Sequence, residues 1–210
     1  MEEQIFKECN ILKPRLADLS KKEDLYNFQT KNHLNCSPNK NILECQKKDI
    51  PVFLTRLIDS EKFARDLFWI TTSKEDQNKI VGSIGLSIDK DDDTVGEINT
   101  FSVDPNFRNK GIGTELIKYC MAKVKEYKLK RVYLVTTNYM TSAISLYEKF
   151  GFRAYKEILI KVEDGVSKVT EDLEEYNRFS EDSKFKATFY ELFMDKNENE
   201  DENEMEKIEL

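Results

Sequence analysis

The stretch of sequence that decides the fold reads Phe101-Ser102-Val103-Asp104-Pro105-Asn106-Phe107-Arg108-Asn109-Lys110-Gly111-Ile112-Gly113-Thr114. It predicts a strand that ends at Val103, a turn that carries two cations, and a helix that begins at two glycines. The first turn of a helix has unpaired backbone N–H groups and the positive end of the helix dipole. Glycines let a ligand approach those N–H groups closely, so the stretch is suited to bind a phosphate.

The spacing of the glycines excludes two common phosphate-binding motifs. A P-loop needs Lys followed by Ser or Thr after its second glycine, whereas Gly113 is followed by Thr114 and Glu115. The dinucleotide signature needs a third glycine at the position of Leu116. Gly-x-Gly alone is also compatible with a tight strand-to-helix turn that binds nothing, so the surrounding elements must decide.

Downstream of the glycines, the pattern changes from helix to strand twice. Residues 111–128 carry apolar side chains at steps of three or four, which is typical of a helix packed on one face. We expect a strand over 131–136 and a helix over 142–150 that ends at Gly151. Two further strands, 153–162 and 187–194, flank an acidic segment.

Upstream of the glycines, the pattern predicts three strands separated by polar turns, at 67–72, 80–88 and 95–103. Before them we expect a strand within 5–14, a helix at 22–34, a loop at 35–49 and a helix at 50–59 with Pro51 in its first turn. This order indicates one domain with a mixed α/β layer structure.

Two motifs together resemble the GNAT acetyltransferase superfamily between Leu67 and Phe152. They are the Arg-x-x-Gly-x-Gly run that starts at Arg108 and the later run Leu146-Tyr147-Glu148-Lys149-Phe150-Gly151-Phe152. The resemblance implies an α/β GNAT acyl-CoA N-acyltransferase fold. Its mixed, mostly antiparallel sheet would have about seven strands with a splayed parallel pair, flanked by about four helices.

Within the superfamily, the chain looks most like the camello-like N-acetyltransferases. The supporting pieces are Phe68-Trp69-Ile70, Val81-Gly82-Ser83-Ile84-Gly85 and Val135-Thr136-Thr137. Relatives of that kind carry a hydrophobic membrane anchor. The longest apolar runs here, such as 67–70, are far shorter than the ~18 residues of a membrane helix, so we expect a form without an anchor and without a membrane span.

The resemblance implies acetyl-CoA as the co-substrate and names the residues that would bind it. The loop would hold the pyrophosphate through Arg108, Asn109, Lys110, Gly111, Ile112, Gly113 and Thr114. The preceding strand would offer backbone groups of Phe101, Ser102 and Val103 to the pantetheine. Asn138 is a further candidate, because many members place an asparagine nearby, at the position that Met140 occupies here. Scattered cysteines and a single histidine predict no metal site.

Acetyl transfer to an amine needs a base, an oxyanion donor and a proton for the departing thiolate. The resemblance implies direct attack in a ternary complex, with Tyr147 as the acid toward the CoA sulfur; a packed helix aromatic is the alternative. Glu97 is the candidate base, since it shares strand parity with Phe101 and Val103, although a bulge or an exposed edge would turn it to water. His33 lies far from the motifs, so a His-activated nucleophile is not supported.

Charge is concentrated at the end of the chain. The net charge is −7, and residues 195–210, with eight acids and two lysines, hold −6 of it. We therefore expect a GNAT domain over 1–194, a disordered acidic tail over 195–210, and no nucleic-acid partner. The four cysteines read as free thiols of a reducing compartment, which favours the cytoplasm and leaves the nucleus open.

The acceptor is the least determined feature of the sequence. Eight acidic side chains between 163 and 182 would attract a lysine, a protein N-terminus or a small basic amine, and they would equally suit a solvated loop. A protein that keeps the GNAT fold without catalysis, as an interaction or structural module, is the alternative function. The oligomeric state is left open.

Overall fold

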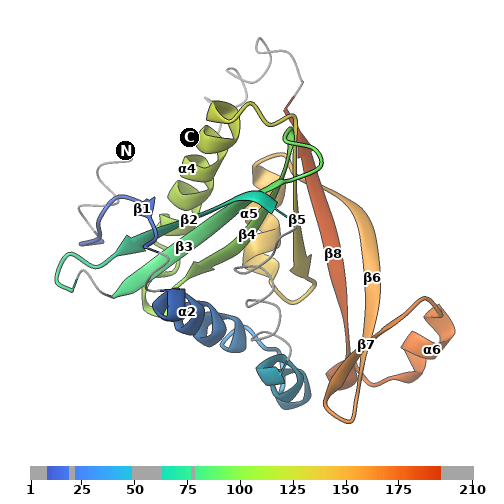
Figure 1. Ribbon diagram of the computed structural model, residues 1–210. Helices are drawn as coiled ribbons and strands as arrows, with labels where there is room; N and C mark the ends of the chain where they lie inside the picture. The colour runs from blue at the N-terminus through green and yellow to red at the C-terminus, as the bar shows by residue number, and fades with distance from the viewer. Residues whose placement is uncertain (1–8, 19–21, 49–62, 77–78, 195–210) are drawn as a thin grey trace.

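The computed structural model describes residues 9–18, 22–48, 63–76 and 79–194. These residues form one mixed sheet in the order β1-β2-β3-β4-β5-β8-β6-β7 (Figure 1). The strands are β1 (Arg15–Leu16), β2 (Phe63–Thr72), β3 (Ile80–Asp89), β4 (Val95–Val103), β5 (Arg131–Thr137), β6 (Arg153–Glu163), β7 (Val166–Thr170) and β8 (Lys184–Phe193). The helices are α2 (Lys22–Leu34), α4 (Ile112–Glu126), α5 (Thr141–Lys149) and α6 (Leu173–Arg178), and residues 40–48 are also helical.

The sheet has the predicted splayed parallel pair and one strand more than expected. β4 and β5 are the parallel neighbours, and their register covers only Val95–Glu97 against Arg131–Tyr133. Both strands continue beyond this point, to Val103 and Thr137, without further pairing to each other. The strands therefore diverge from Glu97 onward and leave a split in the middle of the sheet.

Helices cover both faces of the sheet. α4 packs on β3 and β4 and buries the predicted apolar stripe, and α5 joins the same core through Tyr147. α2 packs on the opposite face, where Leu25 contacts Phe68 and Ile70 (Figure 1). The two faces of the sheet at the split between β4 and β5 are thus covered by different helices, α4 and α5 on one face and α2 on the other. Within the described ranges, no helix combines the length and the apolar composition that a bilayer span requires.

A β-bulge in β4 reverses the face to which its side chains point. Ser83 pairs with Ser102 and Gly85 pairs with Asn99, so β4 carries an extra residue between these pairs, and Thr100 there has φ 46°. Before the bulge, Ile98 packs in the core under α4; after it, Phe101 and Val103 do. The predicted common face of Glu97 with Phe101 and Val103 is wrong, because strict alternation fails at a bulge.

The first third of the chain departs most from the sequence prediction. Residues 40–48 are helical where a loop was expected, and Ile42 and Cys45 are buried against Val162 and Phe185. Residues 9–14 form only a single bridge, Ile11 to Ser73, before β1. Residues 5–8, the predicted helix at 50–59 and the tail at 195–210 lie outside the described residues.

We expect that Gly85→Ala destabilises the domain by about 2 kcal/mol, as overpacking typically does. A Cβ on Gly85 would come within 2.8 Å of the Phe68 ring and closer still to Asn99 and Thr100 of the bulge. Urea unfolding measures the change. Gly113→Ala is the matched control, because its nearest neighbour would be 3.3 Å away at the Phe101 ring. Equal stability of the two variants would contradict this account of the bulge.

Candidate active site

The loop between β4 and α4 leaves backbone donors unused. Asp104 closes the turn after β4, since its side chain accepts a hydrogen bond of 2.9 Å from the Asn106 backbone N–H. Asn109 (φ 59°) and Gly111 (φ 79°) then adopt left-handed backbone, and α4 begins directly after Gly111. Gly111 has no side chain with which to cap the helix, so the first N–H groups of α4 remain available to an anion.

Cations surround this loop. Arg108 folds back on β4, where its Nε donates to the Val103 carbonyl at 3.0 Å and its Nη2 lies 3.7 Å from Cys36 Sγ. Lys110 and Lys79 stand over the Phe107 ring, at 5.3 and 5.4 Å from its centre. Lys79 precedes β3, and no sequence pattern predicted that it lies beside the loop. The loop thus combines three positive side chains with the positive end of α4.

Asn138 lies at the end of β5 and is tied to β8. Its Oδ1 accepts a hydrogen bond of 2.9 Å from the Lys186 N–H, and its own N–H donates to the Lys186 carbonyl at 3.0 Å. The asparagine therefore fixes how β5 ends beside β8. Met140, which occupies the position where many family members have an asparagine, is the N-cap residue of α5 and makes no side-chain hydrogen bond there.

Tyr147 packs beside β4 on the face that α4 and α5 cover. It is buried in an aromatic cluster, with ring centres 6.0 Å from Phe101, 6.1 Å from Phe152 and 6.4 Å from Tyr190. Burial, with a smaller contribution from the thiol of Cys120, raises the pKa of Tyr147 well above its ordinary value. The phenol is therefore a neutral proton donor throughout the physiological range.

Glu97 lies on the opposite face, at the last paired position before the strands diverge. Tyr133, its register partner on β5, donates a hydrogen bond of 3.0 Å to Glu97 Oε2. Burial, and then the carboxylate of Glu97, raise the pKa of Tyr133 well above its ordinary value. Tyr133 thus stays a donor and orients the carboxylate.

Glu97 belongs to a row of polar side chains that crosses this face of the sheet. The row runs through Asp66 on β2, Ser87 on β3, Glu97 and Tyr133, in successive register pairs. Asn99 donates to Ser87 Oγ at 2.8 Å, and burial raises the pKa of Asp66 above its ordinary value. The sequence did not predict this row, because its members come from four strands.

The split therefore has the carboxylate of Glu97 on one face and Tyr147, packed beside Phe101 of β4, on the other, and the cationic loop follows the end of β4. A reactive carbonyl held between β4 and β5 would have a base on one side and an acid on the other. This arrangement suits an amine that attacks from the face of Glu97 while a thiolate departs toward Tyr147.

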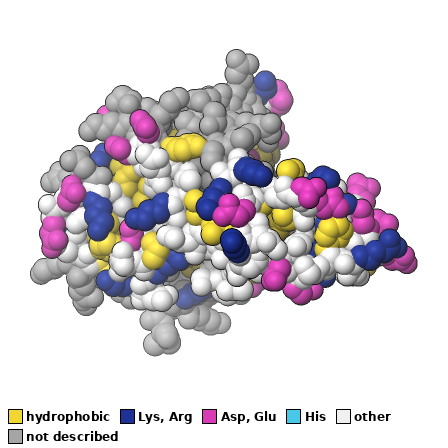
Figure 2. Space-filling view, turned by 90° about the horizontal axis from the view of Figure 1, so that it is seen from below, with side chains coloured by type: hydrophobic (Ala, Val, Ile, Leu, Met, Phe, Trp, Pro, Cys, Tyr) yellow, Lys and Arg dark blue, Asp and Glu magenta, His cyan; other side chains and the backbone are white. Residues whose placement is uncertain are grey.

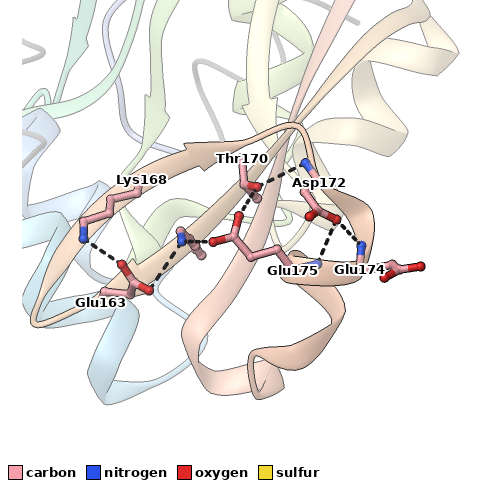
Figure 3. Close-up of polar contacts among 7 residues, drawn as sticks. Glu163, Lys168, Thr170, Asp172, Glu174 and Glu175 are labelled. Carbon is pink, nitrogen blue, oxygen red and sulfur yellow. Dashed lines mark hydrogen bonds and ion pairs between the residues drawn. The ribbon is translucent and has the colours of Figure 1, made fainter.

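Part of the acidic segment is ion-paired with neighbouring lysines and an arginine. Lys161 pairs with Glu163 and Glu175, Lys168 pairs with Glu163 at 2.7 Å, and Asp172 accepts two backbone N–H bonds at the start of α6 (Figure 3). Figure 2 shows acidic and basic side chains interspersed at the end of the molecule where β7 and α6 lie. This pairing weakens the negative field that the sequence predicted for an acceptor.

Comparison with known proteins consistently finds acetyltransferases. A family model described as the acetyltransferase (GNAT) family matches residues 28–152. N-acetyltransferase 8B of Homo sapiens is 32% identical over 90 residues, which cover 41% of this chain and 38% of that protein. The spermine/spermidine N(1)-acetyltransferase of Bacillus subtilis (strain 168) is 34% identical over 62 residues, or 29% of this chain and 41% of that protein.

Among solved structures, a GNAT family acetyltransferase from Elizabethkingia anophelis with acetyl-CoA bound has a TM-score of 0.54. It is 19% identical, and the match covers 88% of this chain and 99% of that one, which shows the fold. The curated relatives are matched over half of their own length or less, 38% and 41% in the two examples above. The region that the family model matches, residues 28–152, includes the loop, the split and Tyr147.

Proposed function

Because the chain belongs to the acetyltransferase (GNAT) family, we propose that it transfers the acetyl group of acetyl-CoA to a primary amine. The amine attacks the thioester directly, within a ternary complex. One observation carries the proposal: the loop from Arg108 to Gly113 presents free helix N–H groups and cations at the end of a split between parallel strands. Acetyl-CoA is the co-substrate that members of this family bind, as in the Elizabethkingia structure.

Each candidate residue then has a role in the transfer. The N–H groups of Ile112, Gly113 and Thr114 and the side chains of Arg108 and Lys110 hold the pyrophosphate. The backbone of 101–103 lines the split for the pantetheine. Glu97 accepts the proton that the attacking amine loses, and Tyr147 donates a proton to the sulfur as the bond between carbon and sulfur breaks.

The acceptor is a primary amine on a small molecule, a lysine or a protein N-terminus. One relative is named for acetylating spermine and spermidine, which supports small amines within this range. The paired carboxylates near α6 do not favour a highly charged polyamine over the other amines. A panel of one amine from each class, assayed for CoA release, distinguishes them.

Calorimetric titration with acetyl-CoA tests the proposal first. We expect micromolar binding by the parent protein, and a loss of about tenfold to a hundredfold in affinity for Arg108→Ala, since one charge-assisted hydrogen bond contributes about 1.5–3 kcal/mol. Arg178→Ala is the matched control, because Arg178 is an exposed arginine of α6 that lies 3.9 Å from Glu174.

Two results would overturn the proposal. A folded parent protein that binds no acetyl-CoA would favour the non-catalytic GNAT-fold module, and protein partners would then be the next target. An Arg108→Ala variant that binds as tightly as Arg178→Ala would remove the loop from the cofactor site. ATP serves as the ligand control, because it carries an adenine nucleotide without the pantetheine.

A further inference from the structure

A completely buried glutamine joins α2 to the bulge of β4. Gln29 has 0% exposed surface, although its carboxamide carries two donors and an acceptor. Its Nε2 donates to Ser83 Oγ and to the Thr100 carbonyl, and its Oε1 accepts a hydrogen bond of 2.9 Å from Ser102 Oγ. Both ends of the side chain are thus used, and two of the three partners belong to β4.

The partners of Gln29 surround the strained point of β4. Thr100 is a β-branched residue with φ 46°, a backbone conformation that such residues rarely adopt. Its carbonyl accepts a second hydrogen bond, of 2.8 Å, from Ser83 Oγ. A conformation of this kind persists only where the surrounding contacts determine it. Gln29 and Ser83 supply these contacts from a helix and from the neighbouring strand.

The bulge decides which groups line the split. It turns Phe101 and Val103 toward Gly113 and Tyr147, while Glu97 remains on the face of α2. Regular alternation would instead place Glu97 and Phe101 on one face. The opposed positions of the carboxylate and the phenol therefore depend on the backbone shape that Gln29 holds.

We infer that Gln29 is a positioning residue for the acyl end of the cofactor site. It fixes the bulged backbone at Thr100, so that residues 101–103 meet the pantetheine and Glu97 and Tyr147 stay on opposite faces. This inference rests on the proposed function. The side-chain hydrogen bonds of Gln29 go to β3 and β4, so it acts through the backbone of β4.

The test uses Gln29→Met, which keeps the length of the side chain and removes its hydrogen bonds. Asn32→Leu is the matched control: Asn32 is also a buried carboxamide of α2, but its Nδ2 donates to Phe28 O of its own helix at 2.8 Å. Three quantities are measured for each protein: the thermal midpoint, the Kd for acetyl-CoA, and the Kd for 3′-phospho-ADP, the nucleotide part of CoA.

We expect Gln29→Met to lower the thermal midpoint, because it loses three buried hydrogen bonds. Asn32→Leu should change the midpoint less, because it loses one hydrogen bond within its own helix and also removes a buried Oδ1 without a partner among the described residues. Only Gln29→Met should weaken acetyl-CoA binding, by about tenfold. Its affinity for 3′-phospho-ADP should stay within about twofold of the parent value, since this probe reaches only the loop.

The outcomes separate the two proposals. If the parent protein binds neither ligand, the proposed function fails. If the parent binds both and Gln29→Met binds acetyl-CoA as Asn32→Leu does, the positioning role is overturned and Gln29 only stabilises the fold. If Gln29→Met weakened the binding of both ligands equally, the positioning role would also be overturned, because the effect would then not be confined to the acyl end.

Discussion

Tyr147→Phe is expected to lower kcat about 100-fold, the lower range of what a general acid contributes. The substitution removes only the hydroxyl, and the ring keeps its contacts with Phe101, Phe152 and Tyr190. Stability and the Kd for acetyl-CoA should therefore stay near the parent values. Since burial raises the pKa of Tyr147, the parent enzyme should show no loss of rate from tyrosine ionisation near the ordinary tyrosine pKa.

Tyr190→Phe is the matched control for this prediction. Tyr190 belongs to the same aromatic cluster, but its hydroxyl donates to Glu148 Oε1 at 3.4 Å. Loss of that hydroxyl should leave kcat within about twofold of the parent, since no proton transfer depends on it. If both variants turn over like the parent, Tyr147 is a packing residue and the acid must be sought elsewhere, for example in a water molecule.

Glu97→Gln is expected to lower kcat by about 100-fold, because the amide cannot accept the proton of the amine. The amide can still accept the hydrogen bond of 3.0 Å from Tyr133, so the fold should be retained. Initial rates at saturating acetyl-CoA measure kcat.

Glu191→Gln controls for the loss of a carboxylate on the same face. Glu191 is the register partner of Tyr133 on β8 and pairs with Arg131 at 2.8 Å. We expect it to keep kcat within about twofold of the parent value. A Glu97→Gln variant with the parent kcat would exclude Glu97 as the base, and the polar row through Ser87 and Asp66 would become the next place to look.

The variants divide the site into two functions. Arg108→Ala should act on the affinity for the whole cofactor, and Gln29→Met on the part of it that the pantetheine contributes. Tyr147→Phe and Glu97→Gln should act on turnover with the affinity unchanged. If Arg108→Ala changed only kcat, or if Tyr147→Phe and Glu97→Gln changed only affinity, binding and chemistry would be assigned to the wrong residues.

The sequence by itself predicted the elements whose cause is local. α4 and its apolar stripe follow from apolar residues spaced three and four apart. The loop before α4 follows from Gly111, because glycine readily adopts the left-handed backbone found there. β4 was predicted with the bounds Val95–Val103 that the structure shows. The family resemblance then supplied the splayed parallel pair, which is confirmed.

Tertiary structure alone decided how the predicted residues face one another. The bulge at Thr100 depends on Gln29, 71 residues away, and it moved Glu97 to the face opposite Phe101. Likewise, Lys79 lies beside the loop because it stacks over the Phe107 ring. Residues 40–48 are helical because Ile42 and Cys45 pack against Val162 of β6 and Phe185 of β8. Periodicity records the conformation of a single segment, whereas such partners lie on other segments, so only the packed chain determines them.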